Sequence, residues 1–244
     1  MFMALIAPRA SGLTPVLDLH APDGFLSVSV ALLLWIVTIA VLALSVSRAN
    51  RTLDERMVPL MGVTAAFIFA AQMVNFPVAG GTSGHLLGGV LAAILLGPWV
   101  GTLVMACVVT VQALVFQDGG LLALGANIFN MGIVGTLGGF AIYAAGCRLL
   151  GGEARGRLPA AGIAAWSAVM LGALAMTLEL VASGTSPLAV ALPAMLGVHA
   201  LIGIGEALVT VGALALIRAA RPDLLTLREA SGISVGAPRA QGAG

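Results

Sequence analysis

Seven long apolar runs dominate the sequence and constrain the fold more than any other feature. Only 9% of the residues are charged, whereas soluble domains carry about 25% charged residues. Runs of this kind are typical of membrane-spanning helices, and they lack the alternation of β-barrel strands. We therefore predict an all-α, polytopic helical membrane protein with about seven transmembrane helices. We place them near residues 24–47, 57–75, 84–97, 99–117, 124–149, 159–182 and 188–218.

The third run is too short to cross a bilayer as a helix. At about 1.5 Å per residue it would cover about 20 Å, whereas the hydrocarbon core is about 30 Å thick. We therefore expect its first residues, Gly84 and His85, to lie below the membrane surface. Non-helical backbone at that depth must be buried in protein or line a wet cavity. Residues 76–83 are predicted to form such a buried loop.

Arginine predicts the orientation in the membrane. The chain has no lysine and eleven arginines. If the first run starts outside, ten arginines fall in inner loops or in the C-terminal tail, and only Arg9 lies outside. Cytoplasmic loops carry the excess of basic residues, so we predict an outer N-terminus and a cytoplasmic C-terminus. A net charge of +1 without a basic cluster argues against nucleic acid as a partner.

The chain divides into four predicted segments. Residues 1–18 form a leader that lacks the order of a signal peptide, and residues 19–23 form an arm. Residues 24–221 form the seven-helix membrane domain. The tail, residues 222–244, consists mainly of glycine, alanine and arginine with a few acids, a composition that predicts disorder.

Two of the three histidines lie on the predicted outer side. His20 is on the arm and His85 is in the buried loop. Each alone is more typical of a packed histidine, but two together on one face of so apolar a bundle favour a shared metal site, because neutral histidine is the commonest metal ligand. Two imidazoles hold a divalent ion weakly, so further donors are needed. Asp23 suits a turn or a helix cap, and Asp118 suits the opening of a Gly-Gly turn, and we favour these structural roles over ligation.

Ionisable residues within the spans are functional candidates by default. Glu179 lies near the outer end of its run. His199 and Glu206 are about two turns apart, so they share one helix face. They are interpreted either as an internal hydrogen-bonded pair or, with Glu179, as a relay.

The second run has small residues four apart, at Gly62, Ala66 and Ala70. Small residues at this spacing let another helix approach closely. They suit either a contact within the fold or docking of another membrane subunit.

Several motifs together resemble the CbiM/NikM family, the substrate-binding membrane subunits of energy-coupling factor (ECF) transporters for cobalt and nickel. They are His20-Ala21-Pro22-Asp23-Gly24, the loop from Gly80 to Gly89 that contains His85, Gln117-Asp118-Gly119-Gly120 with Asn127 and Asn130, and His199 with Gly203 to Ala207. The resemblance extends from about residue 19 to residue 218. Each motif alone is weak, and their combination is specific.

The resemblance implies that a planar set of nitrogens binds the ion. The donors are a free N-terminal amine, the amide nitrogen and imidazole of the second residue, and the loop histidine. In this chain they correspond to Leu19, His20 and His85. Such a set suits Ni²⁺, and low-spin Co²⁺ tolerates it. The polar residues expected around these ligands are Asn75, Ser83, Gln112, Asp118, Asn127 and Asn130.

The position of the arm departs from the family pattern. Leu19 has no free amine unless the chain begins there, either because its codon is the true start or because a protease removes the leader. We favour a start at Leu19. The same ligands would serve both metals, so the resemblance does not choose between nickel and cobalt.

The resemblance also implies partners and a location. A membrane coupling (T) subunit, cytoplasmic ATPases and a small CbiN/NikN-like membrane subunit are expected, in the bilayer of the bacterial cytoplasmic membrane. The chain lacks the nucleotide-binding motif G-x-x-x-x-G-K-[ST], so we expect a transport subunit and not an enzyme. The alternatives are an ion-coupled secondary transporter or channel and a membrane metalloenzyme, although H-E-x-x-H is absent.

Overall fold

The computed structural model describes residues 19–73, 76–77 and 83–225. The predicted leader and residues 226–244 of the predicted tail lie outside the described residues, as does Asn75. The elements in chain order are α1 (Val28–Ala49), α2 (Met57–Gln72), β1 (Phe76–Pro77), β2 (Ser83–Gly84), α3 (Gly89–Leu96), α4 (Pro98–Phe116), α5 (Leu124–Asn127), η2 (Ile128–Gly138), α6 (Gly139–Leu149), α7 (Glu153–Ala182) and α8 (Leu188–Ala220).

The all-α prediction is confirmed. Five helical segments of the described chain are long and apolar enough to cross a membrane, with α5, η2 and α6 counted as one continuous segment. The apolar helix α2 is shorter, and α3 has only eight residues. The two strands have two residues each and pair antiparallel, Phe76 with Gly84 and Pro77 with Ser83. All seven predicted runs therefore contain helix.

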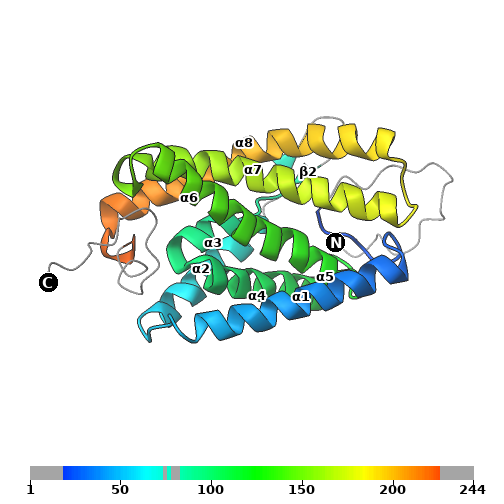
Figure 1. Ribbon diagram of the computed structural model, residues 1–244, viewed down its shortest axis with the longest axis horizontal. Coiled ribbons are helices and arrows are strands. Elements are labelled where there is room, and N and C mark those ends of the chain that lie inside the picture. The colour runs from blue at the N-terminus through cyan, green and yellow to red at the C-terminus, as the bar shows by residue number, and fades with distance from the viewer. Residues whose placement is uncertain (1–18, 74–75, 78–82, 226–244) are drawn as a thin grey trace, which may run out of the picture.

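The helices run along the long axis of the molecule in two groups, with α3 between them (Figure 1). The helices α6, α7 and α8 form one group, and α1, α2 and α4 lie on the other side. Every residue of α3 is buried, which explains why this short helix is apolar all round. The buried face of α7 carries many alanines, among them Ala161, Ala165 and Ala168, each of which is fully buried. Small residues let helices approach closely, which drives packing where lipid surrounds the protein.

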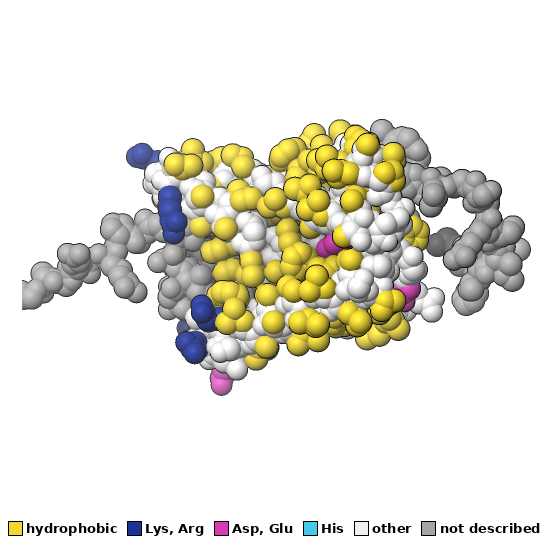
Figure 2. Space-filling model, turned by 45° about the vertical axis from the view of Figure 1, so that its right-hand side comes forward, with side chains coloured by type: hydrophobic (Ala, Val, Ile, Leu, Met, Phe, Trp, Pro, Cys, Tyr) yellow, Lys and Arg dark blue, Asp and Glu magenta, His cyan; other side chains and the backbone are white. Residues whose placement is uncertain are grey.

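The outer surface of the bundle is apolar. Leu33 and Ile36 of α1 and Leu208 and Leu216 of α8 are all more than half exposed. Figure 2 shows hydrophobic side chains over the middle of the molecule and arginines gathered at one end. Because side chains that face lipid must be apolar, this distribution supports the assignment as a membrane protein.

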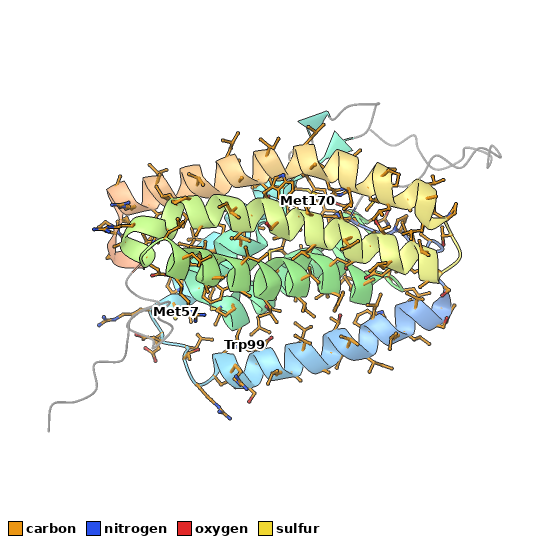
Figure 3. The ribbon with its side chains drawn as sticks, turned by 45° about the horizontal axis from the view of Figure 1, so that its top comes forward. Met57, Trp99 and Met170 are labelled. Carbon is orange, nitrogen blue, oxygen red and sulfur yellow. The ribbon has the colours of Figure 1, made fainter. Side chains whose placement is uncertain are left out.

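The two ends of the bundle differ in composition. Arg48, Arg148 and Arg218 lie in the last turns of α1, α6 and α8, at what we call the arginine end. The Arg48 guanidinium lies 5.4 Å from the ring centroid of Trp99, and Figure 3 shows Trp99 and Met57 toward this end. We call the opposite end, where residues 19–27 lie, the arm end (Figure 1).

Three helices start several residues from their predicted positions. The first helix starts at Val28 and not at residue 24, because Gly24 has a φ of +91° and Ser27 caps the helix. The third starts at Gly89 and not at residue 84, which leaves a helix of about 12 Å. The sixth starts at Glu153 and not at residue 159, so that Pro159 lies inside α7.

The fifth segment is continuous but is not α-helical throughout. Its middle part, η2, is a π-helix of eleven residues, in which each N–H bonds to the carbonyl five residues earlier. Such stretches are rare and often mark functional sites.

The small-residue face of α2 lies on the surface. Gly62, Ala66 and Ala70 are all exposed, and a Cβ added at Gly62 would meet nothing within 4 Å. The interpretation of this face as a contact within the fold is therefore wrong.

Candidate metal-binding site

The arm is inserted into the bundle at the arm end. Leu19, His20 and Ala21 are each less than 5% exposed, and the Leu19 side chain lies against Gly172 of α7. The Asn127 amide binds the arm backbone at both of its functional groups. Its Oδ1 accepts from the Ala21 N–H at 2.9 Å, and its Nδ2 donates to the Ala21 carbonyl at 3.1 Å. The arm is therefore a fixed part of the fold.

A glycine turn forms the surface on which the arm lies. Gly119 has a φ of +96°, and a Cβ there would lie 2.7 Å from the Asn127 amide nitrogen. A Cβ at Gly120 would lie 2.1 Å from an oxygen of Asp23. The Gly120 N–H also donates to the Ala21 carbonyl at 2.9 Å. Both glycines are therefore required for the close approach of the arm.

Asp23 lies in a turn, one of the two roles that its sequence context predicts, in which the Phe25 N–H donates to the Pro22 carbonyl at 3.5 Å. Its carboxylate accepts from the N–H groups of residues 121, 122 and 123 at 2.8–3.1 Å. These N–H groups lie in the turn that precedes α5, so Asp23 ties the arm to the start of that helix. The alternative role predicted for Asp23, as cap of the first helix, belongs to Ser27.

His20 and His85 lie face to face. Their ring centroids are 4.7 Å apart and their planes differ by 22°, and both side chains are buried. The Nδ1 of His20 lies 3.4 Å from a carboxylate oxygen of Asp118, whose side chain is 36% exposed. The structure thus brings together the two histidines predicted to share a site, with an acid at the entrance.

The His85 imidazole has a defined tautomer. Its Nδ1 lies 2.9 Å from the Leu86 carbonyl oxygen. A carbonyl can only accept, so Nδ1 carries a proton, and in the neutral imidazole Nε2 then carries the lone pair. A second partner that holds Nδ1 in this way is typical of histidines that bind metal through Nε2.

Three helices anchor the backbone of the His85 loop. The two carboxylate oxygens of Glu206 on α8 accept from the N–H groups of Leu87 and Gly88, each at 2.7 Å. Gln72 of α2 donates to the Leu87 carbonyl at 2.6 Å, and Gln112 of α4 donates to Gln72 at 2.8 Å. Within this stretch His85 and Leu87 are buried. Most of the predicted buried loop, residues 78–82, lies outside the described residues.

The other polar residues predicted around the ligands do not lie against the two histidines as a group. Gln112 contacts Gln72 and not a histidine. Asn130 donates to Glu179 at 2.9 Å on α7, so it belongs to a separate buried pair. Ser83 takes part in the strand pairing through its backbone, and Asn75 lies outside the described residues.

Sequence reasoning missed the anchoring role of Glu206 and Gln72. His199 and Glu206 do share the buried face of α8, as their spacing predicts. However, Glu206 binds the loop backbone, and His199 donates from Nδ1 to the Met195 carbonyl at 2.8 Å. The sequence did show a carboxylate inside a membrane helix. A buried carboxylate requires a hydrogen-bonding partner, but the sequence does not identify that partner.

The histidines alone do not complete a metal site. Among the residues that the structure describes, no three His, Cys, Asp or Glu side chains are grouped to hold an ion. His20 and His85 are two nitrogen donors, and the backbone of residues 19 and 20 adjoins the same place. Any site of higher affinity here would therefore draw on backbone nitrogen.

Comparisons with known proteins agree on the class of protein. Residues 20–224 match the family described as "Cobalt uptake substrate-specific transmembrane region", CbiM. A protein of Archaeoglobus fulgidus with the provisional name fused nickel transport protein NikMN is 45% identical over 216 residues, which are 88% of this chain and 70% of that protein. The cobalt transport protein CbiM of Sorangium cellulosum is 35% identical over 192 residues, which are 75% of this chain and 83% of that protein.

A solved structure supports the same conclusion. The crystal structure of a truncated transition metal transporter superposes with a TM-score of 0.73 at 32% identity, covering 81% of this chain and 97% of that one. The family match extends over the arm, the His85 loop and all the helices described above. The chain belongs to the CbiM family of cobalt and nickel transport proteins.

Proposed function

We propose that the chain is the substrate-binding membrane subunit of an ECF-type ABC importer, and that it captures one Ni²⁺ or Co²⁺ ion between the arm and the His85 loop. The observation that carries the proposal is the stacked pair of His20 and His85 at 4.7 Å. One histidine comes from the arm and the other from the irregular backbone just before α3. The membrane domain thus holds the two parts of the site together.

The proposed ligands are four nitrogens. They are the amine and amide of residues 19 and 20, the His20 imidazole and Nε2 of His85. The amide nitrogen would release its proton to water on binding the metal. Amine and amide then close a five-membered chelate ring, and the amide with Nδ1 of His20 closes a six-membered ring. A planar nitrogen set of this kind suits Ni²⁺, Cu²⁺ and low-spin Co²⁺. The amine is available in a chain that begins at Leu19.

Asp118 has a place in this proposal without being a ligand. Its carboxylate contacts the nitrogen of His20 that the six-membered ring requires. An incoming dication would take over that nitrogen, while the negative charge at the entrance attracts it. Binding would replace the contact between Asp118 and His20 by a bond between the metal and His20, and any proton on Nδ1 would move to Nε2 or to water.

The arginine end supports the proposed orientation. If that end is cytoplasmic, the positive-inside rule is satisfied, and the arm end faces the outside of the bacterial cytoplasmic membrane. The partners would be a membrane T subunit, cytoplasmic ATPases that hydrolyse ATP, and a small CbiN/NikN-like membrane subunit. The exposed face of Gly62, Ala66 and Ala70 is the proposed contact for the T subunit, since small residues allow close helix packing.

The test is uptake of labelled Ni²⁺ and Co²⁺ by cells that express the chain with its partners. His20→Ala and His85→Ala should each abolish uptake while the protein stays in the membrane. His199→Ala is the matched control, because His199 bonds within α8 and should leave capture of the ion intact. Wild-type uptake in both site variants would refute the proposal, and uptake driven by an ion gradient without ATPases would show a secondary transporter.

The amine ligand has its own test. Intact-mass measurement of the native protein should give a chain that begins at residue 19. A protein that begins at Met1 and still binds Ni²⁺ tightly would exclude the amine, although the two histidines could remain ligands.

A further inference from the structure

Glu206 binds the same peptide group that binds His85. The N–H of Leu87 and the carbonyl of Leu86 belong to one peptide unit. Its N–H donates to Oε2 of Glu206 at 2.7 Å, and its carbonyl accepts from Nδ1 of His85 at 2.9 Å. This planar unit therefore connects the carboxylate on α8 to the imidazole in the site.

The next peptide unit is held in the same way. The N–H of Gly88 donates to Oε1 of Glu206 at 2.7 Å, and the Leu87 carbonyl accepts from Gln72 at 2.6 Å. Two consecutive peptide planes are thus held at both ends, by α8 on one side and by His85 or α2 on the other. Gly88 has a φ of +78°, and a Cβ there would lie 2.8 Å from Ile68 of α2, so only glycine allows this path.

The bonds to Glu206 are strong for physical reasons. Its side chain is only 2% exposed, and hydrogen bonds from N–H to a buried carboxylate are short and charge-assisted. A peptide that donates to a carboxylate is polarised, which makes its carbonyl a better acceptor. The carbonyl of the unit shared with His85 should therefore hold the Nδ1 proton firmly and keep the Nε2 lone pair available.

We infer that Glu206 is a positioning residue for the metal site, which sets the orientation and tautomer of His85 through the peptide between Leu86 and Leu87. In many metal sites a carboxylate accepts directly from the second ring N–H of the histidine and fixes its orientation. Here one peptide unit lies between the carboxylate and the imidazole. This inference rests on the proposed function, in which His85 binds the ion through Nε2. Gln72 holds the neighbouring peptide and supports the same geometry.

The test compares Glu206→Gln with Glu153→Gln. Glutamine has one acceptor oxygen, so one of the two loop N–H groups loses its partner and meets an amide N–H₂ instead. Glu153 is the matched control, because its carboxylate also accepts two hydrogen bonds, from Tyr143 and Arg157, but at the arginine end. The measurement is the Ni²⁺ dissociation constant of the purified full chain in detergent, by competition with a chelating dye.

The expected result is a dissociation constant raised about tenfold to a hundredfold in Glu206→Gln, with Glu153→Gln unchanged. At saturating Ni²⁺, Glu206→Gln should regain the wild-type Ni²⁺ absorption spectrum, because the ligands are the same. His85→Ala should not regain it. An altered spectrum at saturation would overturn the positioning role in favour of ligation, and an unchanged dissociation constant with lower thermal stability would leave Glu206 a structural role only.

Two further outcomes separate this inference from the proposed function. If the wild type fails to bind Ni²⁺, or if His85→Ala binds it normally, the proposed function fails. If Glu206→Gln does not fold, Gln72→Met decides, because it removes the donor to the Leu87 carbonyl at the other end of the second peptide. A wild-type dissociation constant in folded Gln72→Met would then overturn the inference.

Discussion

Replacing Asn127 with alanine should loosen the arm and weaken metal binding. The change removes both bonds between the Asn127 amide and the backbone of Ala21. The Ala21 carbonyl keeps its bond from Gly120, but its N–H is left without that partner at a residue that is 1% exposed. The loss therefore falls mainly on one buried donor.

The magnitude follows from these two bonds. A buried donor without a partner costs about 1–3 kcal/mol, and the second bond adds about 0.5–1.5 kcal/mol. The docked arm is thus destabilised by roughly 1.5–4.5 kcal/mol, because the two terms act on the same segment. Only the docked arm can place His20 beside His85, so the apparent dissociation constant rises as the docked fraction falls. The two ends of the energy range set an upper limit on this rise of about tenfold and about a thousandfold.

The assay is Ni²⁺ competition titration of the purified protein, with thermal unfolding of the metal-free protein alongside. Thr38→Val is the matched control. It removes a buried hydrogen bond of 2.8 Å to the Gly125 carbonyl, which joins α1 to α5 and does not hold the arm backbone. The control should lose thermal stability and keep its affinity. Wild-type affinity in a folded Asn127→Ala protein would refute the reasoning that this amide fixes the arm.

Three further predictions concern the arm and the bundle. Gly120→Ala should strongly reduce uptake of Ni²⁺ or Co²⁺, because the new Cβ would lie 2.1 Å from an oxygen of Asp23; normal uptake would show that the arm can shift. Gly125→Ala should lower the unfolding temperature without changing the Ni²⁺ spectrum at saturation, because its Cβ would lie 2.7 Å from Trp35. Ni²⁺ at a hundredfold excess over its dissociation constant should stabilise the wild type by about 2.7 kcal/mol, an effect that chelation should remove. An equal thermal shift in His85→Ala would mean that the ion binds elsewhere.

Much of the fold could be predicted because membrane insertion leaves a local signature. A helix in lipid must be long and apolar, so the runs that became α1, α4, α7 and α8 were visible without any knowledge of packing. Boundaries were less predictable. The sixth run was placed from residue 159, although α7 begins at Glu153, and the π-helix η2 has no distinct hydrophobic pattern.

The residues of the proposed site could be identified from the sequence, but their arrangement could not. His20 and His85 stood out because ionisable groups are rare in so apolar a chain, and the glycines at 119 and 120 marked a turn. The partners of Asp23, Asn127 and Glu206 did not stand out, because each binds backbone N–H or carbonyl groups distant in sequence. Nearly every residue has the same backbone N–H and carbonyl groups, so the sequence does not show which of them a side chain will bind.

The sequence by itself determined the class of fold and the separation of arginines to one end. It also identified the two histidines that are candidates for a shared metal site. Length, apolarity and charge are properties of a segment, and lipid acts on them directly. Only the tertiary structure decided that the arm enters the bundle, that Asn127 and Asp23 hold it, and that Glu206 reaches His85 through a peptide. Those contacts depend on how helices pack, because a hydrogen bond forms only where two groups meet at the right distance and angle.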